Sequence, residues 1–357
     1  MPRLSLVTKG RDDSTGGPAR PSTPSRQLGR RNGGAPLYRQ VCDSIEALAM
    51  SLPLEDERPL PPEPELMAAF GVSRGTVRRA VDELVRDGLL RVGAGRGTFV
   101  VAATKMRWMV WDRLVEVARP DSRFDMDLSR FVPDFAGSDL CTSAVTSLPG
   151  YLGPGPLFLT PDNSLEGLRL RALEDGRRLI VPTFGMHRGF VLVDGGRLDR
   201  RDLAMAATLD GMERHGRHLS LDELRRAEPV GLVVTGAVAV TTRGLHVGGG
   251  EGYFDLEWGL LRHLGLASPR TTVVVVAHSC QVVDADVRAA PHDAVADIIV
   301  TPEGATGCRP RLPKPDGLFW EELRSTGGRA RPYVDELTAE LSAPAQALGG
   351  RAYRRPQ

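Results

Sequence analysis

The stretch "VGLVVTGAVAVTTRGLHVGGGEGYFDLEW" runs from Val230 to Trp258. Its first part, Val230–Val240, is almost continuously apolar, which is typical of a strand that is covered on both faces of a sheet. The glycine-rich segment that follows precedes a helical pattern, and a loop between a buried strand and a helix is a frequent anion-binding site because free backbone amides meet there. The loop carries an acid, Glu251, where a basic side chain would assist an anion. The sequence thus predicts an anion-binding loop and leaves open whether it supports catalysis.

Further strands and helices alternate around this stretch. Besides Val230–Val240, strands are expected near Leu157–Thr160, Arg178–Pro182, Phe190–Val193, Thr272–Ala277 and Asp297–Thr301, and helices near Ser164–Asp175, Leu221–Arg226 and Phe254–Leu264. This alternation predicts an α/β domain with a mostly parallel sheet and helices on both of its faces.

Length and composition limit the class of protein. A chain of 357 residues with 25% charged residues and a net charge of +1 is expected to form two globular domains and to lack a general attraction to nucleic acid or membrane. Four cysteines without a C-x-x-C pair argue against a zinc site or a disulfide framework. No apolar run approaches the roughly 20 residues that cross a bilayer. We therefore expect a cytoplasmic protein without a membrane partner.

A separate helical pattern precedes the α/β part. In "LMAAFGVSRGTVRRAVDELVRDGLL" we expect a helix, a turn at Gly71, and a second helix capped by the Ser73 hydroxyl. Its predicted buried stripe contains Val77, Ala80, Val81 and Leu84, and its opposite face carries Arg74, Gly75, Arg78 and Arg79. "LLRVGAGRGTFVV" then predicts a hairpin with a glycine-rich tip.

This module resembles the winged helix-turn-helix of the GntR family of bacterial transcription regulators. The resemblance rests on "LPPEPEL" (60–66), "GVSRGTVRRAVDEL" (71–84) and "GLLRVGAGRGTFV" (88–100). It implies a recognition helix in the major groove, a wing in the minor groove, and a homodimer on a palindromic double-stranded DNA operator. The residues that we expect to contact DNA are Ser73, Arg74, Thr76, Arg78, Arg79, Gly95 and Arg96. Gly75 stands where the family often has a second hydroxyl residue.

The charge pattern agrees with a DNA-binding module. Residues 73–101 contain six arginines and three acids, whereas residues 43–65 contain seven acids and one arginine. Arg74 and Arg78 lie one helical turn apart and suit bidentate contacts with guanine. A module that docks only protein is the alternative interpretation.

Residues 105–337 resemble the 5-formyltetrahydrofolate cyclo-ligase family, in particular its archaeal and methenyltetrahydrofolate synthetase domain-containing branch. The resemblance rests on stretches throughout this segment, among them "MRWMVWDRL" (106–114), "LEGLRLRALEDGRRLIVPT" (165–183), the opening stretch and "HDAVADIIVTPEG" (292–304). It implies a three-layer α/β/α sandwich related to the sugar-phosphate isomerase and CoA-transferase group. The ligand-binding residues that it implies are Arg107, His246, Gly248, Gly249, Gly250, Glu251, Gly252 and Tyr253, with Asp255 and Asp297 near a Mg²⁺ ion if the enzymatic site is retained.

The loop departs from this family in charge. The cyclo-ligases have basic side chains at the positions of His246, Gly249 and Glu251, and removal of such cations weakens stabilisation of a phosphoryl-transfer transition state. We assign no catalytic residue. The expected function is transcription regulation, in which the cyclo-ligase-like domain forms the dimer and binds an effector. The expected effector is a folate, a nucleotide or a sugar phosphate. Mg²⁺ is an expected cofactor if the effector is a nucleotide or a folate. An active ATP-dependent cyclo-ligase fused to a DNA-binding domain, and a tight turn without ligand, are the alternatives.

These resemblances define the expected domains. Residues 1–35 are expected to form a disordered basic tail, 36–103 the winged helix, 104–337 the cyclo-ligase-like domain, and 338–357 a second tail.

Overall fold

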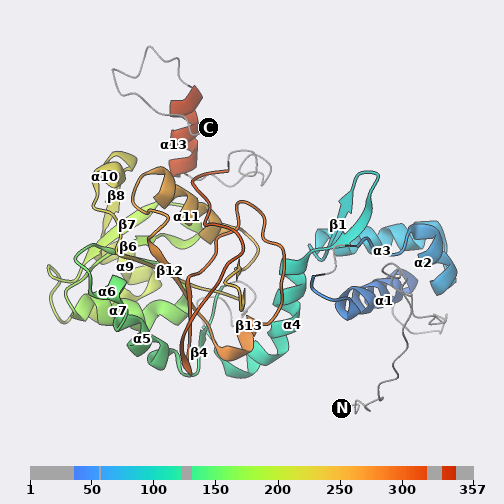
Figure 1. Cartoon of the computed structure of the whole chain (residues 1–357), viewed down its shortest axis with the longest axis horizontal. Helices are drawn as coiled ribbons and strands as arrows, with labels where there is room; N and C mark the ends of the chain where they lie inside the picture. The colour runs from blue at the N-terminus through green and yellow to red at the C-terminus, as the bar shows by residue number, and fades with distance from the viewer. Residues whose placement is uncertain (1–35, 56–57, 122–130, 320–331, 343–357) are drawn as a thin grey trace. The chain divides into compact units, whose positions relative to one another are not determined.

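The computed structural model describes residues 36–55, 58–121, 131–319 and 332–342. The chain divides into two compact units, residues 1–101 and 102–357 (Figure 1). The division lies two residues before the expected boundary, because helix α4 already begins at Ala102. The expected tail 1–35 lies outside the described residues.

The described residues of the amino-terminal unit, 36–55 and 58–101, form three helices and a hairpin. They are α1 (Leu37–Ser51), α2 (Glu63–Phe70), α3 (Arg74–Arg86), β1 (Leu90–Gly93) and β2 (Gly97–Val100), with β1 and β2 antiparallel. Gly71 ends α2 in the left-handed conformation, with φ of 64°, and Ser73 caps α3. The predicted helix-turn-helix and hairpin are therefore confirmed.

The core of this unit follows the apolar spacing with one exception. Val77, Ala80 and Leu84 of α3 are buried against α1 residues such as Val41 and Ile45. Val81, which was expected in the buried stripe, is only half-buried because it lies at the margin of the face that meets α1. The arginine face of α3 is exposed as predicted.

The carboxy-terminal unit is built on one large sheet. Its helices are α4 (Ala102–Val117), α5 (Ser138–Thr146), α6 (Pro149–Leu152), α7 (Glu166–Glu174), α8 (Leu203–Ala207), α9 (Leu209–His215), α10 (Leu221–Arg226), α11 (Tyr253–His263) and α13 (Pro332–Ser342). The strands of the large sheet are β5 (Leu157–Leu159), β6 (Arg178–Pro182), β7 (Phe190–Asp194), β8 (Arg217–Leu219), β9 (Leu232–Gly236), β12 (Thr272–Val276), β14 (Ile298–Thr301) and β15 (Gly304–Gly307). Smaller sheets contain β3 (Ala118–Arg119) with β4 (Asp134–Phe135), and β10 (Ala239–Thr241) with β11 (His246–Val247) and β13 (Val282–Val283).

The strand order of the large sheet is β15-β14-β12-β9-β5-β6-β7-β8. The five strands from β14 to β6 are parallel to their neighbours, whereas β15, β7 and β8 join antiparallel at the two edges. The sheet is thus mostly parallel, as the sequence predicts.

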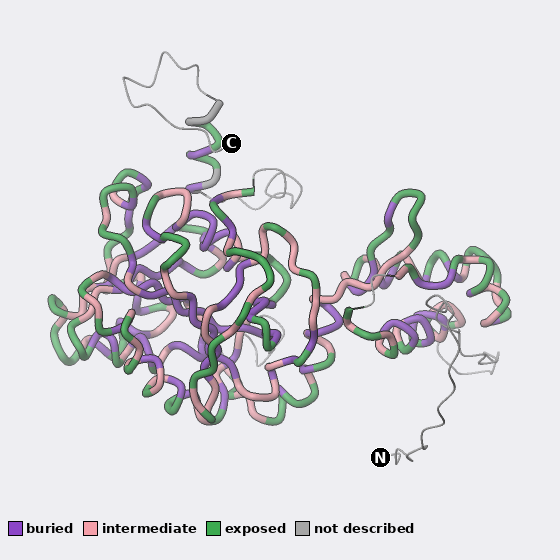
Figure 2. Tube along the Cα trace, in the orientation of Figure 1, coloured by how far each residue is buried: buried purple, intermediate pink, exposed green. Residues whose placement is uncertain are grey.

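Helices cover both faces of this sheet. One apolar cluster joins the sheet to α5, α7, α8 and α9, and a second joins it to α10, α11 and α13. Figure 2 shows the buried strands in purple between these helices. The unit therefore has the expected three layers, α/β/α.

The apolar run Val230–Val240 does not form one strand. It is divided into β9 and β10, which belong to different sheets. The division falls at Gly236, where a Cβ atom would lie 2.8 Å from Ser164 Oγ and 2.9 Å from Val132 Cγ1. Uniform burial on both sides of this point hides the break from a pattern of apolar residues.

The carboxy-terminal boundary also differs from the expectation. Helix α13 runs through position 338, and Leu337 is buried. Tyr333 anchors the helix, since its hydroxyl accepts from Phe190 N at 3.0 Å and donates to Leu219 O. Only residues 343–357 of the expected tail lie outside the described residues.

Arg169 of α7 secures the loop that follows β5. Its buried guanidinium donates to Ala207 O at 2.8 Å and, through one amino group, to Thr160 O and Asp162 O at 2.9 Å. Arg169→Met would leave these carbonyls without this donor, so we expect the free energy of unfolding to fall by about 3 kcal/mol.

Urea denaturation followed by tryptophan fluorescence measures this change, because all four tryptophans lie in residues 102–357. Arg171→Met is the matched control, since Arg171 forms an exposed pair with Asp175 whose loss costs about 0.5 kcal/mol or less. Equal effects of both substitutions would contradict the assignment.

Candidate functional site

The recognition helix α3 begins with two hydroxyl residues that bind each other. Ser73 Oγ accepts from Thr76 N at 3.3 Å, and the two hydroxyl oxygens are 2.9 Å apart. Ser73 is therefore the N-cap of α3, and Thr76 lies in the first turn of this helix.

Arg74 and Arg78 share one carboxylate. Arg74 Nε donates to Glu63 Oε2 at 2.7 Å, and Arg78 Nε donates to Glu63 Oε1 at 2.9 Å. These bonds lower the pKa of the Glu63 carboxyl, so it stays ionised. Because each bond uses Nε, the terminal amino groups of both arginines remain available for base edges.

Arg79 differs from the other two arginines. Its Cζ lies 3.8 Å from the ring centroid of Tyr38 in α1, so its guanidinium stacks on this aromatic ring. The stacking directs Arg79 toward α1, and contact of Arg79 with DNA stays a prediction.

The hairpin tip carries Arg96 between Gly95 and Gly97, which have φ of 68° and 108°. A Cβ at Gly97 would lie 2.9 Å from Pro59 Cβ, and Leu60 N donates to Thr98 O at 2.7 Å. The segment before α2 therefore packs against the base of the hairpin and leaves Arg96 exposed at its tip.

Glu63 was not recognised from the sequence, and its role gives a test. We expect Glu63→Gln to lower the discrimination between operator and scrambled DNA by about tenfold, because Arg74 and Arg78 lose the carboxylate that orients them. Fluorescence anisotropy at fixed salt measures the two affinities. Glu65→Gln removes a neighbouring acid as the control, and undiminished discrimination in Glu63→Gln would refute the orienting role.

In the carboxy-terminal unit the glycine loop joins β11 to α11. Gly249, Gly250, Glu251 and Gly252 are exposed, and Gly250 and Gly252 have φ of 111° and 65°. Gly252 precedes α11 and has no side chain to cap it, so the first amides of this helix face the loop. Tyr253 at the start of α11 is half-buried.

Arg107 of α4 brings a cation to this loop. One amino group donates to Gly248 O at 3.2 Å and the other to Thr104 Oγ1 at 2.7 Å. The second amino group lies 3.5 Å from the position of a Cβ on Gly250. Burial lowers the pKa of Arg107, because desolvation disfavours the charged form of its guanidinium.

His246 is buried below the loop. Its ring packs on Phe254 with centroids 4.8 Å apart, and Nε2 lies 2.9 Å from Gly236 O. The contact between His246 Nε2 and Gly236 O holds the start of the glycine loop close to the end of β9. Direct contact of His246 with a ligand stays a prediction.

Asp255 and Asp297 have separate partners. Asp255 Oδ1 accepts from Ala294 N at 2.7 Å, whereas Asp297 Oδ2 accepts from Val273 N at 2.7 Å and pairs with Lys314 Nζ at 2.5 Å. Within the described ranges no three His, Cys, Asp or Glu side chains gather as metal ligands. Asp297 thus has a structural partner that the sequence did not reveal.

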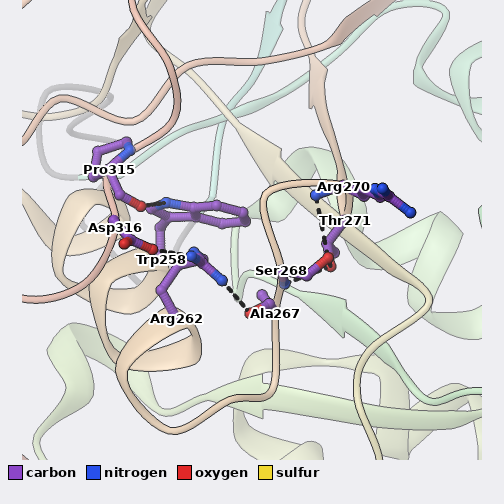
Figure 3. Close-up of polar contacts among 8 residues, drawn as sticks. All are labelled: Trp258, Arg262, Ala267, Ser268, Arg270, Thr271, Pro315 and Asp316. Carbon is purple, nitrogen blue, oxygen red and sulfur yellow. Dashed lines mark hydrogen bonds and ion pairs between the residues drawn. The ribbon is translucent and has the colours of Figure 1, made fainter. Parts of the chain in front are cut away.

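The later turns of α11 are anchored to neighbouring loops (Figure 3). Trp258 Nε1 donates to Pro315 O at 2.9 Å, and Arg262 donates to Ala267 O at 2.7 Å and pairs with Asp316. These contacts fix the helix, so the amides at its start are held in place below the loop.

Two family models match the chain. Residues 37–100 match "Bacterial regulatory proteins, gntR family" and residues 136–302 match the "5-formyltetrahydrofolate cyclo-ligase family". The chain therefore combines a GntR-family winged helix-turn-helix DNA-binding domain with a domain of the 5-formyltetrahydrofolate cyclo-ligase family.

Relatives of each part agree with this division. The methenyltetrahydrofolate synthase domain-containing protein of Homo sapiens is 32% identical over 228 residues, which are 62% of this chain and 58% of that protein. The HTH-type transcriptional repressor NagR of Bacillus subtilis is 43% identical over 65 residues, which are 18% of this chain and 27% of that protein. The chain thus spans less than two thirds of the length of these relatives.

Among solved structures, the DNA-binding domain of AraR in complex with an operator is 38% identical, covering 21% of this chain and 98% of that chain with a TM-score of 0.19. The 5,10-methenyltetrahydrofolate synthetase of Aquifex aeolicus is 18% identical, covering 59% of this chain and 95% of that chain with a TM-score of 0.39. In the part of the chain that the structure describes, no helix has the length and apolar character needed to cross a membrane.

Proposed function

We propose that this protein is a cytoplasmic transcription regulator that binds a palindromic DNA operator as a homodimer and responds to an anionic effector held by its cyclo-ligase-like domain. The observation that carries the proposal is the contrast between two surfaces of the chain. The matched DNA-binding domain exposes Arg74 and Arg78, whereas the glycine loop offers backbone amides at the start of α11.

The loop favours binding over catalysis. Residues 244–253 contain neither lysine nor arginine, and Arg107 is the cation that α4 adds from outside this stretch. Phosphoryl transfer needs several cations around the charge that develops in the transition state. Amides at a helix terminus bind an anion without this requirement. A folate, a nucleotide and a sugar phosphate all carry a suitable anionic group.

In this proposal, the short segment between β2 and α4 connects the DNA-binding domain to the effector-binding domain. The wing strand β2 ends at Val100 and α4 begins at Ala102, so Arg107 lies in the second turn of the helix that follows the wing. An anion that competes for Arg107 would disturb the contact with Gly248 O and shift α4. Such a shift provides the coupling free energy of about 1 to 3 kcal/mol by which an effector changes operator affinity.

The loop can be tested by a single substitution. Gly249 has open space around a Cβ atom and a φ outside the left-handed region, so side chains fit there. We expect Gly249→Asp to weaken binding of ATP, 5-formyltetrahydrofolate or ribose 5-phosphate by at least about tenfold through charge repulsion, whereas the isosteric Gly249→Asn retains binding. Isothermal titration calorimetry measures these affinities, and equal affinities of the two variants would contradict anion binding by the loop.

The regulatory role is tested with DNA from the region upstream of the protein's own gene. At least one of the three ligands is expected to change the anisotropy-derived operator affinity by about fivefold or more, and this change is expected to disappear in Gly249→Asp. An unchanged operator affinity with every ligand would overturn the sensor role. Rapid formation of methenyltetrahydrofolate from 5-formyltetrahydrofolate, ATP and Mg²⁺ would instead establish the protein as an active cyclo-ligase.

A further inference from the structure

The two edges of the large sheet differ in how they are protected against pairing with another strand. An edge strand presents outer N–H and C=O groups, and proteins usually block it with short length, charged side chains or proline. The β8 edge follows this rule, because it has only three residues and two of them, Arg217 and His218, are exposed and carry a cationic or ionisable group. The β15 edge has four residues, of the sequence Gly-Ala-Thr-Gly, and none of them is charged. This edge thus lacks the side chains that prevent strand addition.

The ladder between β14 and β15 determines which backbone groups face outward. Cys308 N, directly after β15, donates to Asp297 O at 2.7 Å, so Cys308 belongs to a hydrogen-bonded pair. Hydrogen-bonded and non-hydrogen-bonded pairs alternate along an antiparallel ladder. Thr306 therefore bonds β14, whereas Ala305 and Gly307 direct their N–H and C=O groups away from β14.

The space beside β15 is open in the part of the chain that the structure describes. Ala305, Thr306 and Gly307 are exposed, and β14 is the neighbour of β15 among the described strands. A Cβ atom on Gly304 or on Gly307 would meet nothing within 4 Å apart from its chain neighbours. A strand that adds to this edge would therefore find room.

The sequence around β15 is complementary to itself. Two identical strands that pair antiparallel are related by a two-fold axis, which is the commonest symmetry of homodimers. With the axis at Thr306, Ala305 would pair with Gly307 of the second copy through the outward backbone groups of both residues. The same register would bring the exposed acid Glu303 opposite the exposed Arg309 of the second copy. Opposite charges would thus flank the paired strands on both sides of the axis.

Helix α5 adds an apolar side chain beside this edge. The helix packs on β14 and β15, and Leu140 is 55% exposed. Thr142 faces α7, since its Oγ1 lies 3.6 Å from the position of a Cβ on Gly167. Leu140 lies two residues earlier and hence about 160° around the helix, on the side away from α7. Because four paired residues bury less surface than a stable interface needs, contact between the two α5 helices would have to add to it.

We propose that the β15 edges of two copies of this chain pair antiparallel about a two-fold axis at Thr306, so that their large sheets join into one continuous sheet. This inference rests on the proposed function, which requires a homodimer, and it assigns the surface that forms this dimer. The occupant is a second copy of the chain, because the register that satisfies the outward backbone groups also pairs Glu303 with Arg309.

The residue on the axis gives the first test. Thr306→Lys would place two like charges face to face, so we expect the dimer dissociation constant of the full-length protein to rise by at least about thirtyfold. Thr306→Val keeps a β-branched, uncharged side chain and is expected to change this constant by less than about threefold. Sedimentation equilibrium measures the constants, and equal values for wild type and Thr306→Lys would overturn the proposal.

Charge reversal tests the register. Glu303→Arg and Arg309→Glu are each expected to weaken the dimer by at least about fivefold, and the double variant is expected to return to within about twofold of the wild type. Damage to the fold of each subunit would add up in the double variant instead of cancelling. A double variant weaker than either single one would therefore refute this register.

A disulfide tests the same geometry even if Thr306→Lys impairs folding. Residues in a non-hydrogen-bonded antiparallel pair have Cα atoms about 4.5 Å apart, which is within the reach of a disulfide. Thr306→Cys is expected to form a covalent dimer under mild oxidation, whereas Ala305→Cys is not, because its two copies are offset along the ladder. The wild type, with its four cysteines, gives the background. Linkage through both positions alike, or through neither, would contradict the axis at Thr306.

The contribution of α5 is tested with matched exposed side chains. Leu140→Glu is expected to weaken the dimer by at least about fivefold, since it places an acid beside the paired edge. Met205→Glu on α8 changes a side chain that is 54% exposed, and is the control that leaves the dimer unchanged. Equal effects of the two substitutions would exclude α5 from the interface.

The oligomeric state of the wild type separates this inference from the proposed function. If the protein is a dimer whose dissociation constant ignores the substitutions in β15 and α5, the β15 interface fails and the proposed function stands with another dimer surface. If the protein stays a monomer at concentrations far above those that saturate the operator, and binds the operator as a monomer, both fail.

Discussion

The contact between the end of β9 and the loop after β5 is the constraint on which the arrangement of the glycine loop depends. At Gly236 the chain leaves the large sheet, and the missing side chain lets Asp162 and Ser164 approach the backbone. His246 then binds Gly236 O and fixes the start of the glycine loop. The sheet therefore positions both the loop and the polar residues beside it through the same backbone segment.

Local signals explain which parts of the fold could be predicted from the sequence. Gly71 and Ser73 mark the turn and the cap of α3, and the valine-rich runs mark the buried strands. The break at Gly236 could not be seen, because residues on both sides of it are buried and apolar. Helix α13 was missed for a different reason: its anchor, the Tyr333 hydroxyl, acts on strands that lie far away in the sequence.

Contacts between residues that are distant in the sequence also limited the prediction of the site residues. The sequence identified Arg74 and Arg78 by their spacing in α3, but their shared partner Glu63 precedes them by 11 and 15 residues and belongs to another helix. The family resemblance implies Asp297 near a metal ion if the enzymatic site is retained, and this stays a prediction; the pairing of Asp297 with Lys314 could not be seen in the sequence. The burial of Glu257 could not be seen either, because an acid within "YFDLEW" gives no sign of burial, which arises when α11 packs on the sheet.

The proposed function gives the two candidate surfaces different physical means of binding anions, and this difference would fit a regulator. DNA offers many phosphates, so exposed arginines gain affinity through the release of counterions. A small effector must bind and leave within the lifetime of a response, and it shifts an equilibrium only by its difference in affinity for two states. Under the proposed function, neutral amides and one half-buried cation, Arg107, would give a site of moderate strength. Because Arg107 belongs to the helix that follows the wing in the sequence, the proposed binding energy would act on the segment that connects the two domains.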